Sequence, residues 1–89
     1  MHRAEIVIHG KVQGVFFRRF IRDNALQLNL NGYARNISDG TVEAIVEGDL
    51  FNIKCLIEKC RKGPPSSKVK KVDVTYSHAR GEGFFHIKY

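Results

Sequence analysis

Two glycines and two arginines lie close together near the start of the chain, in the stretch Gly10–Arg19, which reads GKVQGVFFRR. Gly10 and Gly14 can adopt backbone angles closed to other residues, so neighbouring N–H groups can turn inward and surround an anion. A helix that starts after the loop would add free N–H donors. An arginine there offers a planar fork that matches two oxygens of a phosphate or carboxylate. The stretch therefore predicts an anion-binding loop or, alternatively, a plain strand-to-helix turn with solvated arginines.

The composition places limits on the class of protein. The 89 residues are enough for one domain, over residues 1–89, with a modest core. Lys and Arg number 15 against 9 Asp and Glu, and the net charge of +6 favours anionic partners in general. No apolar run approaches the ~20 residues of a membrane span, and the first ten residues do not resemble a secretory signal. We therefore expect a cytoplasmic protein with no membrane partner.

Hydrophobic periodicity predicts the elements that must position the loop. Strands are predicted where apolar residues alternate, and helices where they recur every three or four residues. Asp39-Gly40 predicts the turn of a hairpin, and Asp49 predicts an N-cap. The predicted order is strand, helix, strand, strand, helix, strand and a short last strand, over residues 3–9, 17–30, 32–37, 41–47, 50–62, 72–76 and 84–89.

Each predicted helix has a single apolar stripe, and one antiparallel sheet can cover both stripes. The order βαββαβ is typical of the ferredoxin-like sandwich. We therefore predict a ferredoxin-like α+β fold, with an antiparallel sheet, two helices on one face and a short extra C-terminal strand.

Two motifs in order along the chain, VQGVFFR at residues 12–18 and GYARN at residues 32–36, resemble the signatures of the acylphosphatase family. Residues 12–18, VQGVFFR, are similar to the first signature, in which VQGV is followed by two residues and arginine. Residues 32–36, GYARN, continued by DGTVE at 39–43, resemble the second, with Tyr33 where tryptophan is usual. GPP at 63–65 and the alternating aromatic and aliphatic end of the chain are also similar. The resemblance covers nearly the whole chain.

The resemblance implies hydrolysis of acyl phosphates, the mixed anhydrides of a carboxylic acid and phosphate, with no metal or cofactor. By motif position, Arg18 would bind the substrate phosphate and Asn36 would orient the attacking water. The backbone of the phosphate-binding loop would comprise Gly14, Val15, Phe16, Phe17 and Arg18. The expected partner is a small-molecule acyl phosphate, with inorganic phosphate or a similar anion able to occupy the same loop, and we expect a monomer.

The chemistry of an acyl phosphate suits these residue types. Its leaving group is a carboxylate of low pKa, so catalysis is mainly positioning plus stabilisation of charge on the phosphate oxygens. Asn36 offers a neutral carbonyl acceptor that can hold a water without adding negative charge. Gln13 is predicted to brace the loop rather than to bind substrate. Arg19 lies outside the motif and is predicted to be exposed, because consecutive helical residues point about 100° apart.

Other classes of protein share this predicted scaffold. The RNA-recognition motif is also a ferredoxin-like sandwich, but it stacks bases on aromatic residues of its central strands. Residues 6–8 and 41–47 carry no aromatic residue, which argues against nucleic acid. A non-catalytic protein-interaction domain, or a domain of a larger carbamoyl-phosphate-handling maturation protein, would also fit the predicted fold. The histidines at positions 2, 9, 78 and 86 show no metal-ligand spacing.

Overall fold

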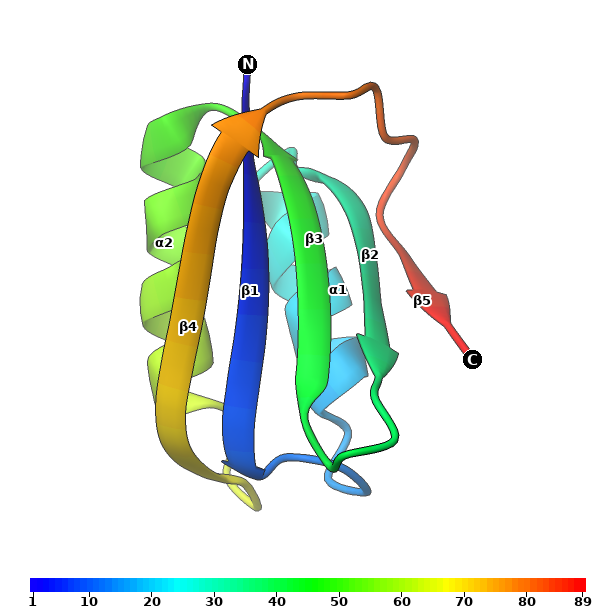
Figure 1. Cartoon of the computed structure of the whole chain (residues 1–89), viewed down its shortest axis with the longest axis vertical. Helices are drawn as coiled ribbons and strands as arrows, with labels where there is room; N and C mark the ends of the chain where they lie inside the picture. Colours follow the sequence, from blue (N-terminus) through cyan, green and yellow to red (C-terminus); the bar gives the residue numbers. More distant parts are fainter.

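The computed structural model describes all 89 residues, as a five-stranded sheet with both helices packed on one face (Figure 1). The elements are β1 His2–Lys11, α1 Phe17–Gln27, β2 Asn31–Asn36, β3 Val42–Gly48, α2 Leu50–Lys62, β4 Lys68–His78 and β5 His86–Lys88. The strand order is β4-β1-β3-β2-β5. The neighbouring strands pair antiparallel, except that β5 pairs parallel with β2. The predicted ferredoxin-like sandwich is confirmed. No helix is long and apolar enough to cross a membrane.

The core lies between the sheet and the helices because each element has one apolar face. Along β1 the buried residues alternate, as a strand with one covered face requires. In α2 they follow the predicted spacing of three and four residues. The main buried side chains are Ala4, Ile6 and Ile8 of β1, Phe17, Ile21 and Ala25 of α1, Val42, Ala44 and Val46 of β3, and Ile53, Leu56, Ile57 and Cys60 of α2.

The strand before the loop is longer than predicted, so the loop begins at Val12 rather than at Gly10. Gly10 has φ 129° and follows a register shift in the pairing of β1 with β4. A Cβ at this position would overlap the backbone carbonyl of Lys68. Glycine therefore lets β4 approach β1 closely, and the prediction that Gly10 contributes to the anion cradle is wrong.

Helix α1 ends at Gln27, three residues before the predicted end. The N–H groups of Asn29 and Leu30 donate to the carbonyls of Leu26 and Ala25, and Asn29 has φ 55°. This is a Schellman motif, with asparagine in the left-handed position that glycine usually takes. At α2, Asp49 occupies the predicted N-cap position, but its side chain makes no capping hydrogen bond.

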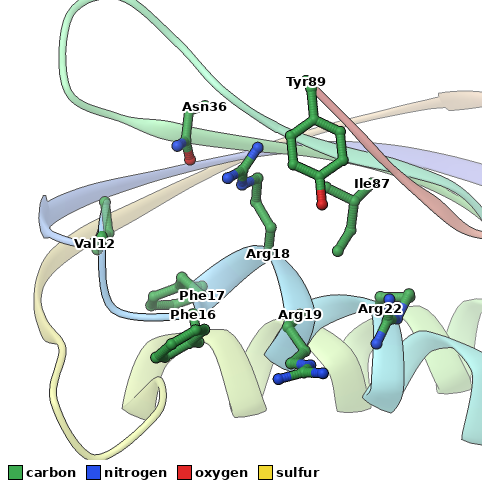
Figure 2. A pocket seen from close by; sticks show the side chains of 10 residues that line it. Val12, Phe16, Phe17, Arg18, Arg19, Arg22, Asn36, Ile87 and Tyr89 are labelled. Carbon is green, nitrogen blue, oxygen red and sulfur yellow. The ribbon is translucent and has the colours of Figure 1, made fainter.

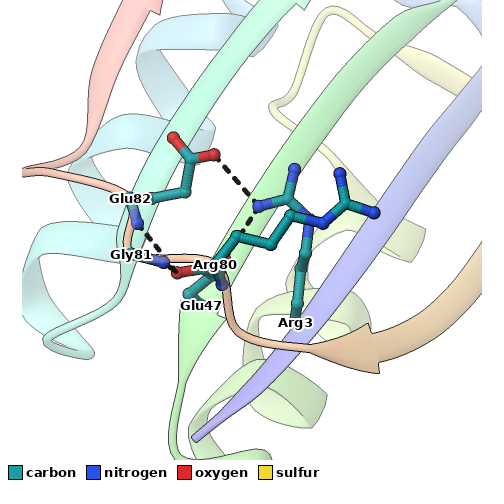
Figure 3. Close-up of polar contacts among 5 residues, drawn as sticks. All are labelled: Arg3, Glu47, Arg80, Gly81 and Glu82. Atoms are coloured by element: carbon teal, nitrogen blue, oxygen red, sulfur yellow. Dashed lines mark hydrogen bonds and ion pairs between the residues drawn. The ribbon is translucent and has the colours of Figure 1, made fainter.

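A buried carboxylate holds the segment that leads into β5 (Figure 3). Glu47 on β3 accepts hydrogen bonds of 2.6 to 3.0 Å from the backbone N–H groups of residues 80–82. Arg3 on β1 pairs with Glu47 at 2.8 Å and with Glu82 at 3.0 Å. Burial raises the pKa of Glu47, but the backbone donors and Arg3 outweigh burial and hold that pKa at about 2. The network directs the chain back toward β2, where β5 is shorter than the predicted strand 84–89.

Candidate active site

The connection between β1 and α1 forms an open loop with unusual backbone angles. Gly14 has φ 74°, as predicted for a loop glycine, but Phe16 also lies in the left-handed region, at φ 62°. The N–H groups of Gly14, Val15 and Phe16 donate no hydrogen bond within the protein. Those of Phe17 and Arg18 belong to the first turn of α1, where no intrahelical acceptor is available. The loop therefore presents a continuous run of free donors at a helix N-terminus, which is a setting suited to an anion.

Arg18 extends from the first turn of α1, and its guanidinium lies between Asn36 and the ring of Tyr89 (Figure 2). Its Nη1 donates a 3.2 Å hydrogen bond to the backbone carbonyl of Lys88. Its guanidinium carbon lies 4.8 Å from the centroid of the Tyr89 ring, a cation–π contact. Arg18 takes part in no ion pair within the chain. Its positive charge is therefore not neutralised by a neighbouring carboxylate.

The adjacent arginine behaves differently. Arg19 is exposed and its guanidinium points away from that of Arg18 (Figure 2), which confirms the prediction made for it. Arg22, one turn further along α1, pairs with Asp23 at 3.1 Å. Arg19 and Arg22 both line the pocket that Arg18 enters, so the rim of this pocket carries positive charge in addition to Arg18.

One pocket of about 380 Å³ brings most of the predicted site residues together. Asn36, the last residue of β2, points its side-chain amide toward Arg18 across this pocket (Figure 2). Val15 does not line it, because its side chain is buried in the core and only its backbone remains available. The lining residues are Val12, Gly14, Phe16, Phe17, Arg18, Arg19, Arg22, Asn36, Ile87 and Tyr89.

Gln13 ties the loop to the β2–β3 connection. Its side-chain Nε2 donates hydrogen bonds of 2.7 Å to the carbonyl of Ile37 and 2.9 Å to that of Thr41. The predicted bracing role of Gln13 is confirmed by these contacts. Asp39 closes the same connection by accepting from the Thr41 side chain at 2.6 Å and from its N–H at 2.9 Å, and these hydrogen bonds lower the pKa of Asp39. The hydrogen bonds of Gln13 therefore fix the loop relative to the β2–β3 connection, which begins next to Asn36.

The contribution of the chain's last residues was not predicted from the sequence. The alternation of Phe85, Ile87 and Tyr89 was visible, but it indicated only a strand face. In the structure Phe85 enters the core, whereas Ile87 and Tyr89 reach the pocket beside Arg18. The parallel pairing of β5 with β2 decides this placement. No local signal in the sequence reports that pairing.

Fold and site together define a class: a ferredoxin-like α+β protein with a loop of free backbone N–H groups between its first strand and first helix. The family model for Acylphosphatase matches residues 4–87, and the chain belongs to the acylphosphatase family. It is 47% identical, over 91 residues that cover 100% of both chains, to an acylphosphatase of Dehalococcoides mccartyi.

Solved structures agree with this assignment. The crystal structure of acylphosphatase from Bacillus subtilis matches with a TM-score of 0.97 at 37% identity, covering 100% of both chains. Full-length HypF, in a phosphate- and nucleotide-bound form, matches with a TM-score of 0.84 at 28% identity. That match covers 100% of this chain but only 12% of HypF. The resemblance found in the two sequence motifs is thus confirmed along the whole fold.

Proposed function

We propose that this acylphosphatase hydrolyses the carboxyl–phosphate anhydride of acyl phosphates through Arg18, Asn36 and the backbone of residues 14–18. One observation carries the assignment of these residues. An arginine without a carboxylate partner, a run of free backbone N–H groups and a neutral amide side chain face the same pocket. The products are a carboxylate and inorganic phosphate.

The loop and Arg18 supply the charge stabilisation. The phosphate oxygens accept hydrogen bonds from the N–H groups of residues 15–18, and the Arg18 guanidinium holds two of these oxygens. Donors that are already oriented stabilise developing charge on the transferring phosphoryl group without reorganisation. The departing carboxylate is a weak base, so it leaves without a general acid.

Asn36 positions the nucleophile, which is a water molecule. Its side-chain oxygen accepts a hydrogen bond from a water and directs the water's lone pair at phosphorus, while its neutrality avoids repulsion with the phosphate. An amide is too weak a base to take the proton. We assign the proton to a substrate phosphate oxygen, and neither a metal nor a cofactor enters the reaction.

A nucleic-acid-binding function finds less support in this molecule. On the open face of the central strands, β1 carries Glu5 and Val7, and β3 carries Glu43 and the buried Ile45. Arg3 lies on the same face of β1, but Glu47 and Glu82 neutralise it, and these strands have no Phe, Tyr or Trp. At the edge of the same face, Lys88 lies over the Tyr33 ring at 3.8 Å, which occupies that aromatic residue within the protein. A base-stacking platform for nucleic acid requires exposed aromatics on these strands.

The direct test is hydrolysis of benzoyl phosphate by the purified protein in the presence of a chelator. We expect release of benzoate and phosphate with no added metal, and loss of this activity in the double variant Arg18→Ala/Asn36→Ala. Inactivity of the natural sequence, or a strict requirement for metal, would contradict the proposal.

Three broader features are part of the same proposal. We expect residues 1–89 to act as one acylphosphatase-like unit, as a monomer, in the cytoplasm. Light scattering coupled to gel filtration measures the mass of the active species, and a dimer at assay concentration would contradict this feature.

A further inference from the structure

Phe16 combines two properties that bulky apolar residues rarely combine. It lies in the left-handed region at φ 62°, where a large side chain is strained. The residue is also 75% exposed, so burial in the core does not offset that strain. The other non-glycine residue with positive φ is Asn29, whose short polar side chain tolerates this region and which caps α1. Nothing in the packing of the protein explains a phenylalanine at position 16.

The location of Phe16 indicates what its ring contacts. The side chain lines the pocket that also holds Arg18 and Asn36 (Figure 2). The N–H group of the same residue belongs to the proposed phosphate cradle, so a bound phosphate lies beside its backbone. In an acyl phosphate only one bridging oxygen separates phosphorus from the acyl carbon. The acyl group therefore leaves the cradle within reach of the Phe16 ring.

Two other side chains at the pocket also expose apolar surface, because Tyr89 is fully exposed and Ile87 is half-buried. Arg19 and Arg22 are charged, and the Tyr89 ring is already in contact with the Arg18 guanidinium. Val12 and Phe17 are buried beneath the loop. Unlike Tyr89, Phe16 contacts no cation within the protein, so its exposed apolar surface is free for a substrate to cover.

We propose that Phe16 determines specificity by favouring acyl phosphates with an aromatic or extended apolar acyl group over small ones such as acetyl phosphate. This inference rests on the proposed function. A benzoyl ring covers the Phe16 ring and gains both apolar burial and an aromatic contact. An acetyl group is too short to do so.

The test compares kcat/KM for benzoyl and acetyl phosphate in the natural sequence and in Phe16→Asn and Phe16→Gly. Both replacements suit the left-handed backbone, so neither adds strain. We expect the benzoyl-to-acetyl ratio of kcat/KM to fall about 3- to 10-fold, the scale of one aromatic contact. Phe16→Tyr, which keeps the ring, should keep the ratio. Because each substrate serves as the reference for the other, intrinsic reactivity and general damage to the cradle cancel.

Asn29→Gly is the matched control, because it changes the other left-handed non-glycine residue away from the pocket, and it should leave the ratio unchanged. An equal loss for both substrates in the Phe16 variants would mean that Phe16 only shapes the cradle and would overturn the inference, as would an unchanged ratio. In both cases the proposed function stands, since the natural sequence hydrolyses both substrates. If the natural sequence hydrolyses neither substrate, the proposed function fails and this inference fails with it.

Discussion

The side chain of Arg18 and the backbone of Lys88, 70 residues apart in the chain, meet through a 3.2 Å hydrogen bond from Nη1 to the carbonyl oxygen. The acceptor is a neutral carbonyl, so the guanidinium is oriented without losing its charge. The bond links the first turn of α1 to the last strand of the sheet, and it directs Arg18 into the pocket (Figure 2). The placement of β5 therefore helps to determine where the positive charge of Arg18 lies in the pocket.

Arg18→Ala should lower turnover of benzoyl phosphate by ~10²–10³, the scale for losing one preorganised charge-stabilising donor. Binding of inorganic phosphate, measured as competitive inhibition, should weaken as well. Arg19→Ala is the matched control, because the neighbouring guanidinium points away from Arg18 and should matter far less. A large loss in Arg19→Ala with little change in Arg18→Ala would reverse the assignment.

Asn36→Ala should lower turnover by about 10²-fold, because a water that is no longer held in line attacks from unproductive positions. Inhibition by inorganic phosphate should change little, since the loop and Arg18 still bind it. Ser38→Ala alters an exposed side chain in the same β2–β3 connection and should retain activity. Loss of phosphate inhibition in Asn36→Ala would instead assign Asn36 to substrate binding.

Gln13→Ala removes both hydrogen bonds that join the loop to the β2–β3 connection. We expect it to lower the free energy of unfolding by about 1–3 kcal/mol, from two net hydrogen bonds. It should also lower kcat more than it weakens phosphate inhibition, because the brace sets the position of Asn36 relative to the cradle.

The control for Gln13 is Asn24→Ala, which removes a 2.8 Å side-chain hydrogen bond to the Phe20 carbonyl on α1. This variant should lose stability without a matching loss of kcat at a temperature where it is fully folded. If Gln13→Ala also keeps its kcat there, the brace serves folding alone.

The stability of the protein should depend on pH through Glu47. Its folded pKa of about 2 lies below the ordinary value of 4.5 for glutamate. The carboxylate therefore stabilises the fold fully above about pH 4.5, and this contribution is lost as the pH falls toward 2. Glu47→Gln should reduce the free energy of unfolding at pH 7 by up to about 3 kcal/mol, since it weakens a buried ion pair.

Thermal unfolding of both proteins between pH 7 and 2 measures this effect. The difference in melting temperature should shrink as the pH falls through that window, because the natural carboxylate becomes protonated. Glu58→Gln removes an exposed carboxylate that pairs with Arg61 at 3.3 Å and should show almost no difference at any pH. A pH-independent difference for Glu47→Gln would mean that the charge of Glu47 is not what stabilises the fold.

Local patterns in the sequence predicted most of the helices and strands, and they singled out the two candidate site residues Arg18 and Asn36. The stripe of α2 and the Asp39-Gly40 turn were predictable because helix periodicity and turn chemistry act between residues a few positions apart. Arg18 and Asn36 could be proposed as site residues from the sequence because each lies in a contiguous motif. The structure adds that both side chains face one pocket.

Only the tertiary structure decided the features that depend on distant backbone segments. Gly10 is needed where β4 approaches β1, Glu47 captures the N–H groups of residues 80–82, and the pairing of β5 with β2 brings Tyr89 to Arg18. Backbone N–H and carbonyl groups are the same in every residue type, so their long-range pairing leaves no pattern in the local sequence. The left-handed backbone of Phe16 could not be predicted from the sequence either. A bulky residue disfavours this conformation, and the fold of the surrounding loop imposes it.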